Sequence, residues 1–275
     1  MLRAGGATHA VRIDVPSAAG RFDVLPTVLN WHGLGDLVDD FVAYSGFETL
    51  AEKENFIVVH PRGEVSTGLP VLESGRGWEL VDFLDTPDRD DIAFARALID
   101  DLIANWCADQ DRIYSIGMSN GGLFTSSLVC GLSDRLAAAA SVAGVYHPET
   151  CQPSEPLPYI AFHGTEDMVV PYEAGGYTVF PELRDNAIFT AGVFDAFAAF
   201  ARGAGCEAEP LESTVAVDVT RYDYSSCSGG TPMSFYAIEG GGHTWPGEPD
   251  GPSTGDIDAT KVSWAFFARQ SRSGT

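Results

Sequence analysis

The sequence predicts an α/β fold in which a mostly parallel central sheet is flanked by helices on both faces. Strand-like apolar runs alternate with helical patterns along the chain, which is typical of a parallel sheet with crossover helices. One of these runs, Phe56–Val59, is continuously apolar, as expected of a strand that is covered on both sides. A buried strand, a sharp turn and the start of a helix also follow one another directly at Ile113–Gly122.

The first half of the chain predicts three strands, two helices and one long loop. Apolar runs and alternation mark the strands, and apolar residues at helical spacing mark the helices. In chain order these are a strand at Val11–Val15, a strand at Pro26–Trp31, a helix at Phe41–Asn55, the strand at Phe56–Val59 and a helix at Asp91–Trp106. Asp90 or Asp91 can cap the last of them. Pro61–Arg89 is rich in Gly, Pro and charge, has no clear period, and predicts a long functional loop.

The second half continues the alternation and closes the domain. After the strand and helix around Ile113–Gly122, we expect strands at Leu136–Val142 and Pro158–Gly164, a loop at Val170–Thr190, a helix at Phe194–Arg202, an antiparallel or edge strand at Ser213–Tyr224, a last sheet strand at Ser234–Ile238 and a helix at Lys261–Arg269. Residues 1–275 are predicted to form a single domain, with a core from about residue 10 to about residue 270 and no large cap domain.

The composition excludes several classes of partner. The chain has 275 residues, 45% of them hydrophobic and 20% charged, which suits one globular domain with a large core. Its formal net charge is −23, from 39 acidic and 16 basic residues, so nucleic-acid phosphates and anionic membrane surfaces would repel it. No run approaches the roughly 18 consecutive apolar residues of a membrane-spanning helix.

The cysteines bear on the compartment. Residues 1–10 lack the apolar core of a signal peptide, so the chain is either cytoplasmic or a mature form whose signal peptide has been removed. Cys206 and Cys227 bracket a predicted β excursion that a disulfide could close, which favours the second alternative. Among Cys107, Cys130 and Cys151, one further pair and one free thiol is the simplest arrangement. Five unpaired buried thiols remain the alternative. No cluster of Cys and His predicts a metal site.

The turn at Ile113–Gly122 carries the first chemical signal. Gly117-Met118-Ser119-Asn120-Gly121 fits G-x-S-x-G, the nucleophile elbow of α/β-hydrolases. A strand that reverses directly into a helix brings the residues two before and two after the serine into contact, so both must be glycine. The serine is then exposed on a strained backbone beside the positive end of the following helix. A strand–turn–helix that merely contains a serine would show the same five letters, so partners are needed.

Two partners follow later strands of the predicted sheet. Asp167 lies just past the next-but-one strand after Ser119, and His243 follows Gly240-Gly241-Gly242 just past the last strand. Functional groups gather at the carboxyl ends of parallel strands, and the chain order Ser, Asp, His is that of α/β-hydrolases. His243 would take the serine proton and return it to the leaving group, while Asp167 would orient the imidazole. The neighbouring Glu166 is the alternative acid.

The remaining groups of such a site are also predicted. One oxyanion donor is the backbone N–H of Asn120, directly after the nucleophile, and the other is the N–H of Leu34, with Gly33 as second choice. We expect the other candidate histidines to be structural, and these are His32, His60, His147 and His163. An acyl-enzyme forms and breaks with protein groups and water, so no cofactor is expected.

Three segments together resemble a known family. Gly117–Gly122, His163–Asp167 with Pro171-Tyr172 after it, and Gly240–Gly247 resemble the polyhydroxybutyrate depolymerase/feruloyl esterase family, the LpqC-like esterases. The similarity extends from about Pro26 to about Phe267. It implies a secreted or periplasmic serine esterase with the α/β-hydrolase fold and the triad Ser119, Asp167 and His243. The cysteines near Cys130, Cys151, Cys206 and Cys227 also look like those of the family, which implies an oxidising compartment.

The aromatic residues bear on the substrate. Trp78, Tyr172 and Trp245 could stack on an aromatic acid, and Met118 would lie beside the nucleophile. This favours a feruloyl or other hydroxycinnamoyl ester of plant polysaccharide. A polyhydroxyalkanoate or other polyester is the close alternative, because its hydrolysis uses the same chemistry. A serine peptidase would normally carry a lid or propeller domain, for which the chain has no room, and a non-catalytic relative would be expected to lack a triad member. The sequence does not indicate the oligomeric state.

Overall fold

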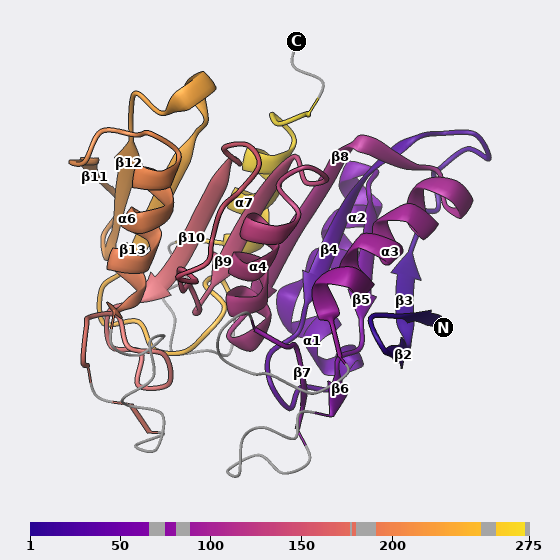
Figure 1. Ribbon diagram of the computed structural model, residues 1–275, viewed down its shortest axis with the longest axis horizontal. Helices are drawn as coiled ribbons and strands as arrows, with labels where there is room; N and C mark the ends of the chain where they lie inside the picture. Colours follow the sequence, from indigo (N-terminus) through magenta and orange to yellow (C-terminus); the bar gives the residue numbers. More distant parts are fainter. Residues whose placement is uncertain (66–74, 81–88, 177, 180–190, 249–256, 273–275) are drawn as a thin grey trace.

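The computed structural model describes residues 1–65, 75–80, 89–176, 178–179, 191–248 and 257–272. A nine-stranded sheet runs through the molecule in the order β11-β12-β13-β10-β9-β8-β4-β5-β3 (Figure 1). Its strands are β3 (Val11–Asp14), β4 (Leu25–Trp31), β5 (Ile57–Pro61), β8 (Ala108–Met118), β9 (Ala138–Val142), β10 (Tyr159–Gly164), β11 (Leu211–Ala216), β12 (Val219–Tyr224) and β13 (Met233–Ile238).

The centre of the sheet is parallel and its edges are antiparallel. All pairings from β13 through β10, β9, β8 and β4 to β5 are parallel. The pairings of β3 with β5, of β12 with β13 and of β11 with β12 are antiparallel. The parallel strands therefore end at the same edge of the sheet, and the loops after β8, β10 and β13 emerge together.

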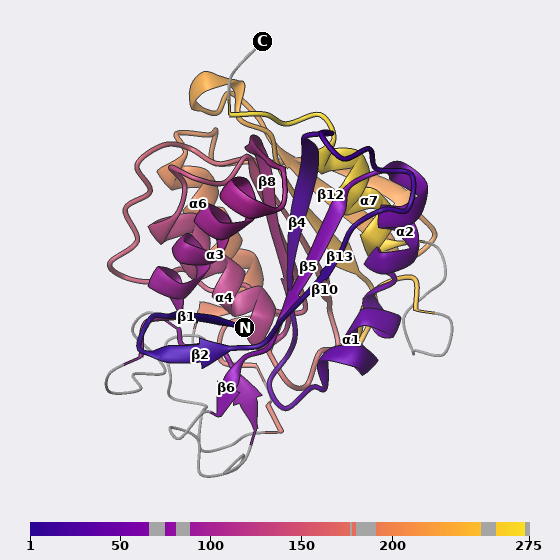
Figure 2. The ribbon, with the colours of Figure 1, turned by 90° about the vertical axis from the view of Figure 1, so that its right-hand side faces the viewer.

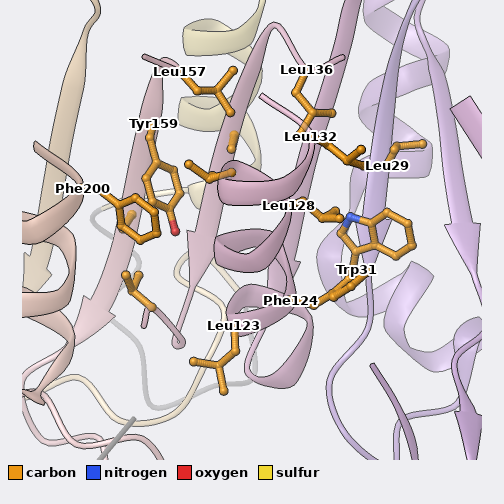
Figure 3. Close-up of a cluster of buried hydrophobic side chains, with 14 of the residues drawn as sticks. Leu29, Trp31, Leu123, Phe124, Leu128, Leu132, Leu136, Leu157, Tyr159 and Phe200 are labelled. Atoms are coloured by element: carbon orange, nitrogen blue, oxygen red, sulfur yellow. The ribbon is translucent and has the colours of Figure 1, made fainter. Parts of the chain in front are cut away.

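Helices cover both faces of this sheet, as the sequence predicted (Figure 2). On one side lie α3 (Asp91–Asn105), α4 (Asn120–Gly131) and α6 (Val193–Gly203), and on the other lie α1 (Val38–Ser45), α2 (Phe47–Glu54) and α7 (Ala259–Phe267). Each face has its own apolar core. On β4, Leu29 and Trp31 belong to the core under α3 and α4 (Figure 3), whereas Val28 belongs to the other. Because both faces are covered, every residue of β5, β9 and β10 is buried, and each aliphatic side chain among them contributes roughly 1.5–3 kcal/mol.

Four local predictions were incomplete. Phe41–Asn55 is not one helix, because Gly46 adopts a φ of 68° between α1 and α2. Ser213–Tyr224 is not one strand but most of the hairpin β11–β12. The first residues also form a hairpin, β1 (Leu2–Ala4) with β2 (Ala7–His9), that was not predicted. Within the predicted loop Pro61–Arg89, two short strands pair, and residues 66–74 and 81–88 lie outside the described part; the strands are β6 (Glu64–Val65) and β7 (Arg76–Gly77).

Two disulfides confirm the predicted cysteine pairing. Cys206 pairs with Cys227 and Cys130 pairs with Cys151, each across a sequence separation of 21 residues. The first bond ties the chain after α6 to the segment after β12, and the second ties the end of α4 to the loop after β9. Cys107 is the exposed free thiol. None of the described helices is both long and apolar enough to span a bilayer.

Candidate active site

Ser119 lies at the turn between β8 and α4. Its backbone has φ 54° and ψ −123°, a conformation that residues with a side chain seldom adopt. The backbone N–H of Ser119 donates to the carbonyl of Val142 at the end of β9, over 2.9 Å, and this bond fixes the turn against the sheet. Strain of this kind persists only where the surroundings enforce it, and it concentrates at functional sites.

The flanking glycines have the predicted steric reason. A Cβ on Gly117 would lie 2.3 Å from the carbonyl oxygen of Gly121, so the two glycines touch across the turn. A Cβ on Gly121 would lie 2.1 Å from the carbonyl oxygen of Trp31 on the neighbouring strand. Neither position has room for a methyl group, and this holds the turn close to β4.

Asp167 and His243 come together beyond the same end of the sheet. They follow β10 and β13, which are parallel neighbours with Gly164 opposite Ile238. His243 Nδ1 lies 2.7 Å from Asp167 Oδ2, and the Asp167 side chain is fully buried. Since the carboxylate accepts, Nδ1 carries the proton and Nε2 is left as the basic nitrogen. This is the tautomer that a general base in a Ser-His-Asp triad requires.

The Asp167 carboxylate is held from both oxygens. Its Oδ1 accepts from the backbone N–H of Val169 at 2.8 Å and of Val170 at 2.9 Å, while Oδ2 faces His243. Burial by itself would raise the pKa of Asp167, but the hydrogen bond from His243 and the backbone donors outweigh it and lower that pKa. The group therefore stays ionised.

The two loops that carry these residues interlock. Gly240 N–H donates to Thr165 Oγ1 at 2.9 Å, and Glu166 N–H donates to the Gly241 carbonyl at 2.9 Å. A Cβ on Gly164 would lie 2.1 Å from the Gly241 oxygen, so this approach depends on glycine. Because the loops bind each other, the imidazole and the carboxylate are positioned as one unit.

His163 is a second imidazole on the same carboxylate. Its Nε2 lies 2.8 Å from the Val170 carbonyl and 3.3 Å from Asp167 Oδ2. Burial lowers the pKa of His163, so the ring is neutral and its Nε2–H donates to the carbonyl. The expectation of a structural role matches this geometry, because the ring ties the loop after β10 to the end of its strand.

The loop after β4 lies beside Ser119. A Cβ on Gly33 would lie 3.4 Å from Ser119 Cβ. The N–H of Gly33 already donates to the Asp36 carboxylate at 2.8 Å. That engagement leaves Leu34, the first choice from the sequence, as the better candidate for the second oxyanion donor. His32 braces the loop, with Nδ1 bonded to the Gly33 carbonyl at 2.7 Å and Nε2 accepting from Gly63 N–H at 2.9 Å.

The predicted substrate contacts need correction. Trp78 and Trp245 are each 1% exposed, so neither ring can stack on a substrate in this structure. Their indole N–H groups donate to the His32 carbonyl at 3.0 Å and to Thr260 Oγ1 at 2.9 Å, which is how a buried tryptophan satisfies its one polar atom. Met118 is 7% exposed and also belongs to the core. Tyr172 is partly exposed and packs near Phe194 and Phe235; its role in substrate binding stays a prediction.

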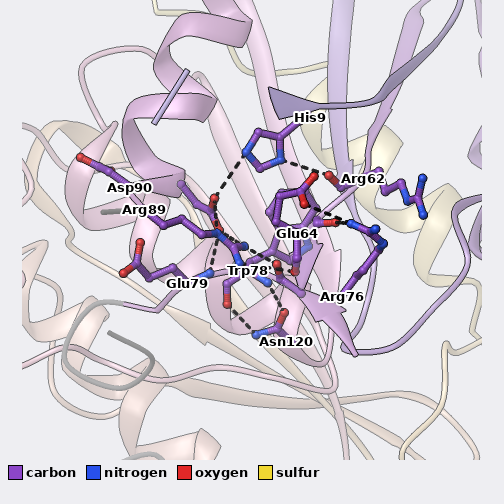
Figure 4. A network of polar contacts seen from close by, with 12 residues as sticks. His9, Arg62, Glu64, Arg76, Trp78, Glu79, Arg89, Asp90 and Asn120 are labelled. Carbon is purple, nitrogen blue, oxygen red and sulfur yellow. Dashed lines mark hydrogen bonds and ion pairs between the residues drawn. The ribbon is translucent and has the colours of Figure 1, made fainter. Parts of the chain in front are cut away.

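A buried polar network next to Ser119 was not predicted. It links His9, Arg89 and Asp91 to the backbone around Trp78 and to the side chain of Asn120 (Figure 4). The one available signal was Arg89-Asp90-Asp91 at the start of a helix, which suggested only a cap. Among the residues that the structure describes, no three His, Cys, Asp or Glu side chains are grouped so as to hold a metal ion.

Comparison with known proteins matches this architecture. The model of the phospholipase/carboxylesterase family matches residues 18–184. Feruloyl esterase B of Piromyces equi is 28% identical over 261 residues, covering 93% of this chain and 44% of its own length. The putative esterase NocK of Nocardia uniformis subsp. tsuyamanensis is 29% identical, covering 88% of this chain and 72% of its own length.

Solved structures show the same fold at low identity. An acetyl xylan esterase from Aspergillus awamori is 15% identical, with a TM-score of 0.65 and coverage of 94% of both chains. A thermostable esterase is 16% identical, with a TM-score of 0.58 and coverage of 96% of this chain and 60% of its own. The feruloyl esterase relatives confirm the resemblance drawn from the three motifs, although the chain spans less than half of the Piromyces protein. This chain has the α/β-hydrolase fold and belongs to the phospholipase/carboxylesterase family.

Proposed function

We propose that the protein is a serine esterase that hydrolyses carboxylic esters through an acyl-enzyme. Ser119 is the nucleophile, His243 the general base and acid, and Asp167 the group that orients the imidazole. The observation that carries this proposal is the 2.7 Å pair of Asp167 and His243, which lies at the same sheet edge as the strained turn of Ser119. The family to which the chain belongs supports it.

The proposed steps follow from these roles. Nε2 of His243 takes the proton as Ser119 Oγ attacks the ester carbonyl, and the backbone N–H groups of Asn120 and Leu34 stabilise the oxyanion. The imidazolium returns the proton to the departing alcohol, and the acyl group stays on Ser119. A water molecule, deprotonated by the same nitrogen, then releases the acid. Asp167 stabilises the imidazolium in both halves of the cycle.

The proposed substrate is an acyl ester carried on plant polysaccharide, and in particular a feruloyl or related hydroxycinnamoyl ester. Relatives that are named feruloyl esterases support a feruloyl group as the acyl part of the substrate. A bifunctional acetylxylan esterase/xylanase of Neocallimastix patriciarum, 28% identical over 171 residues, supports a polysaccharide as the part that carries the ester. Hydrolysis of polyhydroxyalkanoate or another polyester is the competing substrate class. Two disulfides support secretion into an oxidising compartment, extracellular or periplasmic.

The test is hydrolysis by the purified protein. We expect release of p-nitrophenol from short acyl esters, and loss of at least 1,000-fold in kcat in Ser119→Ala with an unchanged unfolding midpoint. Ser225→Ala is the matched control. Ser225 is exposed, donates to Glu207, and lies between β12 and β13, at the opposite end of β13 from His243. If Ser119→Ala retains activity, Ser119 is not the nucleophile.

The acyl group needs a separate comparison. We expect methyl ferulate to be hydrolysed with a higher kcat/KM than an oligomer of 3-hydroxybutyrate. The reverse order would assign the protein to the polyester class while leaving the serine mechanism intact.

A further inference from the structure

Four consecutive residues, Arg76, Gly77, Trp78 and Glu79, lie against both sources of the proposed oxyanion donors. We call this segment the brace. On the side of the loop after β4, the Arg76 carbonyl accepts from Gly35 N–H at 2.7 Å. The Trp78 indole N–H donates to the His32 carbonyl at 3.0 Å. The brace therefore holds the loop that carries Leu34 from both ends.

On the other side the brace holds Asn120 through its side chain. Trp78 N–H donates to Asn120 Oδ1 at 2.7 Å, and Asn120 Nδ2 donates back to the Trp78 carbonyl at 3.1 Å. This two-bond pairing is the one that an amide side chain makes with a single backbone residue. A Cβ on Gly77 would lie 2.6 Å from Leu34 Cδ1 and 2.7 Å from Asn120 Oδ1, so the two donor residues meet over this glycine.

The brace is itself anchored to helix α3. The Arg89 guanidinium donates to the Gly77 carbonyl and to both oxygens of Asp91, and Glu79 N–H donates to Asp91 Oδ2 at 2.8 Å (Figure 4). Arg89 and Asp91 have side chains only 6% and 0% exposed. A buried ion pair contributes little net stability, because desolvation of both charges opposes their attraction, but it fixes geometry.

We propose that the Asn120 side chain and the Trp78 indole are positioning residues for the oxyanion hole, an inference that rests on the proposed esterase function. The backbone N–H groups of Asn120 and Leu34 belong to segments that are far apart in the chain. The brace is hydrogen-bonded to the Asn120 side chain and to the loop that carries Leu34. Hydrogen bonds to a developing oxyanion are effective only within a few tenths of an ångström of the right position. The brace supplies that accuracy.

A purely structural role makes a different prediction. If the brace only stabilised the core, its loss would lower the unfolding midpoint and leave the kinetics of the folded enzyme unchanged. If it positions the donors, its loss lowers kcat with little change in KM, because the oxyanion exists in the transition state and not in bound substrate.

The experiment uses Asn120→Leu, which removes both side-chain hydrogen bonds but keeps the backbone N–H, and Trp78→Phe, which removes only the indole donor. With p-nitrophenyl acetate we expect kcat to fall about 10- to 100-fold in each, with KM within about threefold. Affinity for a boronic acid, whose adduct with the serine is tetrahedral, should fall by a similar factor.

Trp31→Phe is the matched control. Trp31 is fully buried in the same core, contacts Trp78, and donates its indole N–H to Ser115 Oγ at 2.9 Å, away from the oxyanion loop. It should lose stability without losing kcat. If Trp31→Phe and Trp78→Phe lose equal activity, or if Asn120→Leu keeps wild-type kcat, the brace has no positioning role. An inactive wild-type protein would instead refute the esterase function itself.

Discussion

Ser119 has a backbone conformation that is costly for any residue with a Cβ. Its φ of 54° and ψ of −123° lie outside the regions that L-residues prefer, and such strain is on the order of 1–3 kcal/mol. The proposed function gives a reason for a serine there, since its hydroxyl would be the nucleophile at the end of β8. Stability and the proposed function are therefore in opposition at this one residue.

This opposition predicts an unusual order of variants. Ser119→Gly should be more stable than Ser119→Ala by about 1 kcal/mol, since glycine relieves the strain that alanine retains. Urea denaturation followed by fluorescence measures the difference. As control, Ala104→Gly in α3 should lose stability, because glycine is unfavourable inside a helix. If Ser119→Gly is the less stable of its pair, the turn is not strained.

Asp167 provides a second prediction at this scale. Asp167→Asn keeps the acceptor for the two backbone N–H groups but removes the charge that faces His243. We expect kcat to fall about 1,000- to 10,000-fold, by analogy with other triads, with little change in KM. Glu166→Gln is the control and should retain activity. Equal losses in the two variants would point to the loop rather than to the carboxylate.

The proposed catalytic residues were easier to identify in the sequence than the packing around them. Ser119, Asp167 and His243 were identifiable because each follows a strongly apolar strand and lies in a recognisable motif. Trp78 and Trp245 were predicted to stack on the substrate because the sequence places these aromatic residues near the predicted site. Whether such a ring points outward depends on packing against residues far away in the chain, such as His32 and Thr260, which sequence spacing does not encode.

At the scale of elements, the parallel centre was the predictable part and the turns were not. Buried parallel strands are continuous apolar runs, so they can be found one at a time. The break at Gly46 was missed because the helical period continues on both sides of it. The β11–β12 turn at Val217-Asp218 contains one turn-forming residue, Asp218, but neither Gly nor Pro. The Gly5-Gly6 turn of the first hairpin did carry such a signal.

The disulfide between Cys206 and Cys227 predicts how strongly α6 and β12 depend on their covalent link for stability. Replacing Cys206 and Cys227 with serine should lower the free energy of unfolding by about 3 kcal/mol, since the bond closes a loop with a sequence separation of 21 residues. Thermal unfolding in the absence of reductant measures this loss. Cys107→Ser, at the exposed free thiol, should change the midpoint little. A double variant as stable as the wild type would mean that packing of α6 alone holds this region.

At the scale of the whole molecule, acid should be destabilising. His9, His32, His60 and His163 are buried, and burial lowers the pKa of each; for His60 burial, with a smaller effect of Arg12, lowers it from 6.5 to about 3. Above pH 6.5 the ring is neutral in both states. Below it the unfolded chain binds a proton that the folded protein does not, so stability falls as the pH drops toward the folded pKa.

The resulting prediction concerns a slope. His60, with a folded pKa of about 3, should reduce the free energy of unfolding by on the order of 1 kcal/mol per pH unit between pH 6 and pH 4. His60→Gln should make this dependence shallower by about one proton, as measured by urea denaturation at several pH values. The same slope in variant and wild type would show that the His60 ring is protonated in the folded protein.

The sheet order has a consequence for the newly made chain. β13 comes late in the sequence but pairs with β10, and the loop that follows it carries His243, residue 243 of 275. A growing chain that ends between β10 and β13 contains Ser119 and lacks His243. Under the proposed mechanism, any product of premature termination before β13 would therefore be inert toward esters.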